Sequence, residues 1–137
     1  MIDELDLQIL HFLKEDSRRQ WKEIGELVHL TGQAVSARIR KMEDAGIIKG
    51  FTISTDEAKL GNSVTALITM FMTCTNHKSF HTFLKTKTFV SEAHLISGEG
   101  CYWLKINVPS QDDVVRFLDE LLQFGNCRVN MSMNQIK

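Results

Sequence analysis

The chain has 137 residues, with 16 Lys and Arg against 17 Asp and Glu and a formal net charge of −1 at pH 7. No apolar run approaches the roughly 20 residues of a bilayer-spanning helix, which argues against a membrane protein. Acidic residues close to Met1 disfavour a basic secretory leader, and three cysteines without CxxC spacing suit a reducing compartment. We therefore expect a cytoplasmic protein without a membrane partner.

The first 50 residues contain three helix-like apolar patterns. Their stripes are Leu5, Ile9, Phe12 and Leu13; then Ile24, Leu27 and Val28; then Val35, Ile39 and Met42. Residues 29–31 alone separate the second pattern from the third, which is typical of a helix-turn-helix. We expect Thr31 to cap the third helix and Gly46 to end it. The alternation over residues 47–53 predicts a following strand, as in a winged helix.

The third predicted helix has the side chains of a DNA-reading helix. Residues 29–41 include basic side chains and no acidic ones, although residues 1–50 hold eight Lys and Arg against nine Asp and Glu. Gln and Arg can reach base edges or phosphates, and small residues allow close approach to the major groove. Taken alone, the pattern fits a solvated amphipathic helix equally well. The residues predicted to contact the groove are Gln33, Ser36, Ala37 and Arg40.

Further DNA contacts, chiefly to the phosphate backbone, are predicted for Arg19, Thr31, Arg38, Lys41 and Lys49. Arg38 lies nearer the apolar face than Arg40 does. An ion pair with an acidic residue of another helix is therefore the alternative role for Arg38.

The second half of the chain has the pattern β-α-β-β-α-β. Strands are expected over residues 63–75, 90–97, 101–108 and 127–133, with helices between them. Ser110 and Asp113 resemble a capping box at the start of the second helix. This order is the ferredoxin-like, split βαβ arrangement, whose uncovered sheet face needs a second copy of the chain. The residues predicted for that face are Met70, Met72, Met131 and Met133.

Several motifs carry a family resemblance when taken in order. They are Asp3-x-x-Asp6-x-x-Ile9-Leu10, Asp16-Ser17-Arg18, Leu30-Thr31-x-x-x-Val35-x-x-Arg38-Ile39-Arg40-Lys41-Met42-Glu43-x-x-Gly46-Ile47-Ile48, Lys59-Leu60-Gly61 and Ser97-Gly98-Glu99-Gly100-Cys101-Tyr102-Trp103-Leu104-Lys105-Ile106. The chain thereby resembles the leucine-responsive/AsnC (feast/famine) regulators along nearly its whole length. It departs from them at Gly25, Gly32 and Cys101, where the family usually has Ala, Pro and Asp. Both glycines weaken local helix propensity.

The resemblance implies an α+β chain in three parts: a winged helix-turn-helix domain (residues 1–50), a linker (51–61) and a ferredoxin-like dimerisation and effector domain (62–137). It implies a sequence-preferring transcriptional regulator with no catalytic residue and no cofactor. The implied partners are double-stranded DNA and further copies of the chain, as a homodimer or a higher oligomer such as an octamer.

The resemblance also implies a small-molecule effector bound between dimers at the hairpin, and the residues predicted to bind it are Gly98, Glu99, Gly100, Cys101 and Tyr102. The two glycines can turn backbone amides toward an amino-acid carboxylate, and Glu99 can meet an ammonium group. An ordinary tight hairpin is the alternative. Because Cys101 replaces an acidic residue, we expect weak or no response to common amino acids.

Two other functions use the same fold. One is a tetrapyrrole-decarboxylase-like enzyme, which has no need of a cationic helix. The other is an architectural protein that bends DNA with little sequence preference. His77 and His81 have a metal-compatible spacing, but they lack a third ligand in the sequence and are expected on a solvated face. We therefore predict no metal site.

Overall fold

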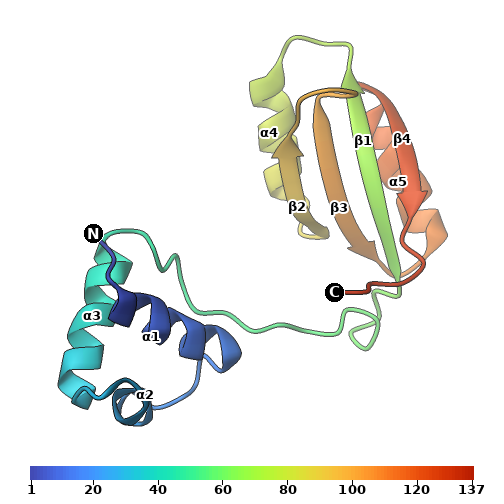
Figure 1. Ribbon diagram of the computed structural model, residues 1–137. Coiled ribbons are helices and arrows are strands. Elements are labelled where there is room, and N and C mark those ends of the chain that lie inside the picture. Colours follow the sequence, from blue (N-terminus) through green and yellow to red (C-terminus); the bar gives the residue numbers. More distant parts are fainter. The chain divides into compact units, whose positions relative to one another are not determined.

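The computed structural model describes residues 1–137 as two compact units, residues 1–54 and 55–137. The first unit consists of helices and the second of a sheet with two helices (Figure 1). Each unit has its own buried apolar core. None of the helices combines the length and the apolar character needed to cross a bilayer.

The first unit packs α1 (Glu4–Glu15), α2 (Trp21–Val28) and α3 (Gly32–Asp44) around a small core. Apolar residues recur at the helical period, so each helix turns one face inward and leaves its polar face in solvent. The predicted three-helix arrangement is confirmed. The buried apolar side chains are Ile9, Leu13, Ile24, Val28, Val35, Ile39 and Met42.

Side-chain caps mark where α1 and α3 begin. The Asp3 carboxylate accepts the Asp6 amide at 2.9 Å, and the Asp6 carboxylate accepts the Asp3 amide at 3.1 Å. The Thr31 hydroxyl accepts the amide of Ala34 at 3.1 Å, as predicted. These bonds satisfy first-turn amides that have no partner inside the helix.

A close backbone contact holds the turn between α2 and α3. His29 ends α2 with a left-handed φ of 60°. The Leu30 amide then donates to the Gly25 carbonyl at 2.8 Å. A Cβ atom on Gly25 would lie 2.4 Å from the Leu30 carbonyl oxygen. On helix propensity alone, Gly25 lowers the stability of α2. The packed turn nevertheless requires glycine, because it has no room for a larger residue there.

The strand predicted over residues 47–53 is not formed. Beyond Ile48, the backbone up to residue 54 makes no hydrogen bond to another segment. Phe51 and Ile53 of this stretch are 49% and 79% exposed. A strand needs a paired neighbour for its backbone groups, and the first unit offers none. The alternating pattern therefore predicted a wing that the single chain lacks.

The second unit contains an antiparallel sheet of order β2-β3-β1-β4. Helices α4 and α5 follow β1 and β3 and cover the same face of the sheet (Figure 1). This confirms the ferredoxin-like prediction, in which two βαβ halves interleave their strands. The bounds are β1 (Val64–Met72), α4 (His77–Thr86), β2 (Val90–Leu95), β3 (Tyr102–Val108), α5 (Gln111–Leu121) and β4 (Gly125–Met131).

Helix α5 begins at the predicted capping box. The Ser110 hydroxyl accepts the Asp113 amide at 3.3 Å, and the Asp113 carboxylate accepts the Ser110 amide at 3.1 Å. Hydrogen bonds from Ser110, and then from Arg116, hold the pKa of the Asp113 carboxyl below its ordinary value. The charged form of Asp113 is therefore the form that the helix start prefers.

The methionines predicted for the open sheet face lie elsewhere, so that prediction is wrong. Met70 is fully buried beneath the helices, and Met72 packs against the same core. Met131 pairs with the buried Ala66 and so points to the helical side, while Met133 lies beyond the end of β4. Successive side chains of a strand point to opposite faces of the sheet. An error of one residue therefore assigns every side chain of the strand to the wrong face. Partly buried residues of the open face are Thr65, Leu67, Thr69, Phe71, Trp103, Lys105 and Asn107.

Candidate functional site

Helix α3 presents a polar face opposite its buried stripe. Gln33, Ala37, Arg40 and Lys41 are exposed on it, and Ser36 is half-buried between them. None of the four exposed side chains is held by a hydrogen bond or ion pair within the chain, which leaves their polar groups free for a ligand. The helix thus combines two free cations, an amide and a small residue on one accessible face, as a major-groove reader requires.

Arg38 points toward the N-terminus of α1 instead. Its Nη1 donates to both carboxylate oxygens of Asp3, at 2.8 and 2.7 Å, and to Oδ1 of Asp6 at 2.9 Å. The Arg38 guanidinium lowers the pKa of the Asp3 carboxyl, and the two carboxylates raise the pKa of Arg38. Of the two roles considered for Arg38, the structure shows the ion pair with another helix.

The remaining cations predicted to reach DNA differ in freedom. Arg19 is half-buried, lies 3.6 Å from a Glu15 carboxylate oxygen and stacks 5.4 Å from the centre of the Phe12 ring. Lys49 is exposed in the segment after α3. The Thr31 hydroxyl is engaged in the helix cap. Lys49 is therefore the freest of these residues, whereas Arg19 is already positioned by α1.

One residue beside this face was not among the predicted DNA contacts. Trp21, the first residue of α2, lines a surface hollow together with α3 residues Gly32, Gln33, Ser36, Ala37 and Arg40. Its indole is 38% exposed. A periodicity argument places a residue on its own helix but does not say which neighbouring helix it faces.

The β2–β3 connection forms the predicted glycine-flanked turn. Gly98 and Gly100 have φ values of 88° and 90°, a left-handed region that favours glycine. The Cys101 amide donates to the Met70 carbonyl at 2.7 Å. Glu99 is exposed, and one of its carboxylate oxygens lies 3.5 Å from Nη1 of Arg128. An acidic side chain and a cation from β4 thus meet at this turn.

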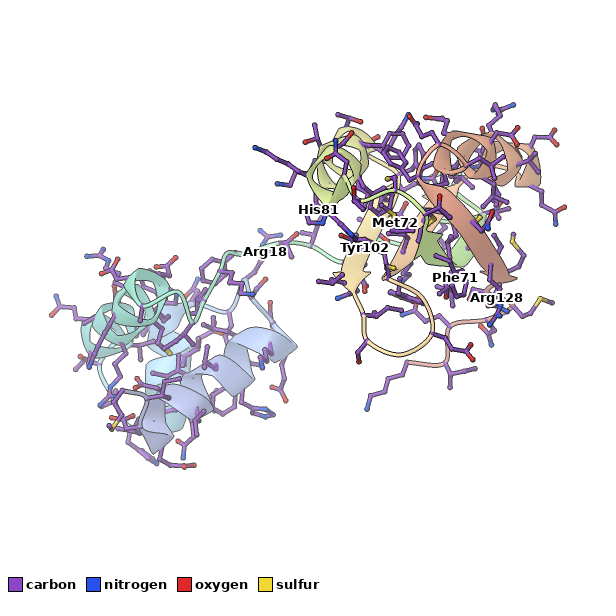
Figure 2. The ribbon with its side chains drawn as sticks, turned by 90° about the horizontal axis from the view of Figure 1, so that it is seen from above. Arg18, Phe71, Met72, His81, Tyr102 and Arg128 are labelled. Atoms are coloured by element: carbon purple, nitrogen blue, oxygen red, sulfur yellow. The ribbon has the colours of Figure 1, made fainter.

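Arg128 also lies over the ring of Phe71, with its guanidinium carbon 5.6 Å from the ring centroid. Both residues lie on the sheet face away from the helices (Figure 2). The Glu99–Arg128 pair therefore borders the open face of the sheet, beside partly buried apolar groups.

Tyr102 is placed differently from the rest of the predicted effector set. Its side chain points beneath α4 and is 3% exposed, while Cys101 is half-buried. The Tyr102 hydroxyl lies 2.8 Å from Nδ1 of His77 and 2.7 Å from Nε2 of His81; Figure 2 shows His81 beside Tyr102. Burial raises the pKa of the Tyr102 phenol.

Both histidines are exposed, as predicted, but the prediction did not include the contact that they share with the Tyr102 hydroxyl. A helical spacing of four places His77 and His81 together, but only the packing of α4 on β3 brings them to a tyrosine. No group of three His, Cys, Asp or Glu side chains converges around them or elsewhere in the chain. The three cysteines are free thiols, and burial raises the pKa of Cys127.

Comparisons with known proteins agree with both units. A family model described as the AsnC-type helix-turn-helix domain matches residues 2–43, and one described as the Lrp/AsnC ligand binding domain matches residues 65–137. The chain belongs to the Lrp/AsnC family. It is 47% identical to the HTH-type transcriptional regulator LrpB of Bacillus subtilis (strain 168) over 136 residues, which is 99% of this chain and 91% of that protein.

Solved structures of transcriptional regulators share the fold. The structure of B. subtilis LrpC superposes with a TM-score of 0.95 at 29% identity, covering 100% of this chain and 98% of that one. The transcriptional regulator NMB0573/L-Met complex from Neisseria meningitidis has a TM-score of 0.93 at 22% identity, with 100% and 93% coverage. This Lrp/AsnC chain is thus a DNA-binding transcriptional regulator with a helix-turn-helix unit and a second unit of the ligand-binding type.

Proposed function

We propose that α3 enters the major groove of duplex DNA and that Gln33, Ser36, Ala37 and Arg40 meet base edges there. The supporting observation is that two arginines of α3, Arg38 and Arg40, differ in their contacts within the chain. Arg38 is held by two carboxylates of α1 and so orients the helix, whereas Arg40 has no partner within the chain. A free guanidinium on an exposed helix face can form two hydrogen bonds to a guanine.

Contacts to the phosphate backbone of DNA are proposed for Lys41, Arg19, Thr31 and Lys49. Lys41 and Lys49 supply free charge, and Arg19 supplies a cation already fixed against α1. Arg38 acts through the position of α3 and not through a contact of its own. Residues 51–61 are the linker between the DNA-binding and effector domains, and the site of action is the cytoplasm, where the DNA lies.

Fluorescence anisotropy with selected genomic fragments tests this assignment. Arg40→Ala should weaken specific binding by about 1–3 kcal/mol and relax the sequence preference. Lys41→Ala should weaken all duplexes alike and reduce the salt slope by about one. Lys85→Ala, which removes an exposed cation from α4 in the other unit, is the matched control. Wild-type binding by both α3 variants would refute the assignment.

The open sheet face supports self-association. Leu67, Phe71 and Trp103 lie there, opposite the helices, and a second copy of the chain is the cover that we propose. The protein is then a homodimer or a higher oligomer such as an octamer. Sedimentation of the full chain at micromolar concentration should give a dimer or larger species, and a monomer would contradict the proposal.

A small-molecule effector is proposed at the turn formed by Gly98, Glu99 and Gly100. Glu99 and Arg128 together offer opposite charges to an ammonium and a carboxylate, and the neisserial regulator of this fold was solved with L-Met. Cys101 takes the place of the acid usual in the family, so we expect weak or no binding of common amino acids, and Cys101→Asp should strengthen it.

Calorimetry with the twenty amino acids tests the effector site, with Glu99→Gln as the diagnostic variant. Gly100→Val is less suitable, because a Cβ there would lie 2.6 Å from Cγ2 of Thr69 and so would distort the hairpin itself. Any effector that changes DNA affinity must have its own affinity changed by DNA to the same factor. Tight leucine binding by the wild type would refute the expectation that Cys101 weakens the binding of common amino acids.

Two alternatives have their own signatures. A purified protein with a Soret-like absorption band would favour the tetrapyrrole enzyme, although the relatives are named transcriptional regulators. Equal affinity for selected and random duplexes would favour an architectural DNA-bending protein. The regulator is expected to be colourless and to prefer its selected fragments.

A further inference from the structure

The hollow beside α3 has an aromatic wall. It has a volume of about 490 Å³. Trp21 supplies its only aromatic side chain, and the rest of the lining comes from the first turns of α3 and from Arg40. The residues that we assign to base contact therefore share one surface depression with an indole from a different helix.

Trp21 is not explained by the core of its own unit. It belongs neither to the buried cluster of that unit nor to the partly buried residues packed against it. The indole is 38% exposed, and it forms no hydrogen bond, aromatic pair or cation–π contact within the chain. An exposed indole of this size on a DNA-facing surface is available for a ligand.

Close packing of two helix starts brings Trp21 to this place. A Cβ atom on Gly32 would lie 3.4 Å from the Cα of Lys22 and 3.5 Å from its amide nitrogen. The first residues of α2 and α3 are thus so close that even one added Cβ would reach van der Waals contact. Trp21 precedes Lys22, and its side chain lines the hollow together with Gln33 and Ser36.

We propose that Trp21 determines specificity by packing against the C5-methyl group of a thymine in the major groove. The indole carries no charge to attract phosphates and offers them a single N–H donor, whereas the thymine methyl is the apolar group that distinguishes base pairs in that groove. Ser36 and Ala37 are small enough to let the base edge enter the hollow. The inference rests on the proposed DNA-reading face of α3 and adds to it a residue from α2.

Replacing thymine by deoxyuridine, one position at a time, in a selected duplex tests the proposal without changing the protein. A homodimer places one Trp21 on each half of the duplex, which we call a half-site. One thymine in each half-site should therefore be sensitive. Replacing one of them should weaken wild-type binding about fourfold, as expected for burial of one methyl-sized group. If no single replacement weakens binding by the wild type, the proposal is overturned.

The Trp21→Ala variant, tested on both the thymine and the deoxyuridine duplex, completes a double-mutant cycle. Because the variant lacks the indole in both protomers of a dimer, it should bind the thymine duplex more weakly than the wild type does by about fourfold for each half-site, and it should show no further loss with deoxyuridine. Trp21→Phe, which keeps an apolar ring, should retain part of the thymine preference. Leu27→Ala removes an exposed apolar side chain from α2 outside the hollow and should bind as the wild type does.

The outcomes separate this inference from the assignment of α3. If Trp21→Ala weakens thymine and deoxyuridine duplexes equally, Trp21 contacts the sugar-phosphate backbone and the thymine proposal fails. If Arg40→Ala weakens binding while Trp21→Ala keeps the thymine preference, Trp21 alone was misassigned. If both variants bind as the wild type does, the reading face itself is wrong.

Discussion

Replacing Gly25 by alanine should destabilise the first unit, although the same change stabilises most helices. In an ordinary helix interior, Gly→Ala gains about 1 kcal/mol, because glycine has the larger conformational entropy when unfolded. At Gly25 the new Cβ would lie 2.4 Å from the Leu30 carbonyl oxygen and 3.2 Å from the Thr31 carbonyl carbon. Both atoms belong to the backbone, so neither can move away by a change of rotamer.

The turn must therefore shift, and the 2.8 Å hydrogen bond from the Leu30 amide to the Gly25 carbonyl shifts with it. Overpacking of this kind costs about 1–3 kcal/mol, and a 2.4 Å contact with a backbone atom places Gly25→Ala in the upper part of that range, about 2–3 kcal/mol. Subtracting the gain in propensity leaves a net loss of about 1–2 kcal/mol. DNA affinity should fall as well, since the displaced turn carries the start of α3.

Urea unfolding measures the effect, with fluorescence of Trp21 followed in a Trp103→Phe background so that the signal reports the first unit. Gly32→Ala is the matched control, because its Cβ would make an ordinary 3.4 Å contact with the Cα of Lys22. That variant should be neutral or gain up to about 1 kcal/mol. A Gly25→Ala protein more stable than the wild type would refute the steric argument.

Two further predictions concern other local features of the fold. His29 is the one residue other than glycine with a positive φ, 60°, so His29→Gly should relieve backbone strain and raise the stability of the first unit by about 1 kcal/mol; an unchanged or lower melting temperature would contradict this. The Asp113 carboxyl has a folded pKa below its ordinary value, so its contribution is complete above the unfolded pKa of about 3.9 and is lost as pH falls through the lower folded pKa. In urea titrations, wild type should therefore exceed Asp113→Asn in stability at pH 7, and the gap should close below about pH 4; a gap that persists in acid would exclude the charge of Asp113 as its source.

Local sequence patterns were enough to predict features that depend on near neighbours along the chain. Thr31 caps α3, and Ser110 and Asp113 form a box at the start of α5, because each partner lies within one helical turn. The helical period likewise identified the stripe of Val35, Ile39 and Met42 as core. The order of strands and helices sufficed for the ferredoxin-like arrangement, since few topologies accommodate that order. The DNA-contacting and effector residues remain predictions.

Contacts between groups that are distant in the sequence became known from the packing of the folded chain. Arg38 turns to Asp3, 35 positions away, and the Tyr102 hydroxyl lies between two histidines of α4. The methionine assignment failed because the buried face of a strand depends on one residue of parity, and the predicted strand over residues 47–53 failed because pairing requires a neighbour that no local pattern supplies. The place of Trp21 beside α3 was likewise not predicted, because it depends on the packing of two helices. A side chain's own helix follows from its position in the sequence, whereas its neighbours follow from the distances between helices.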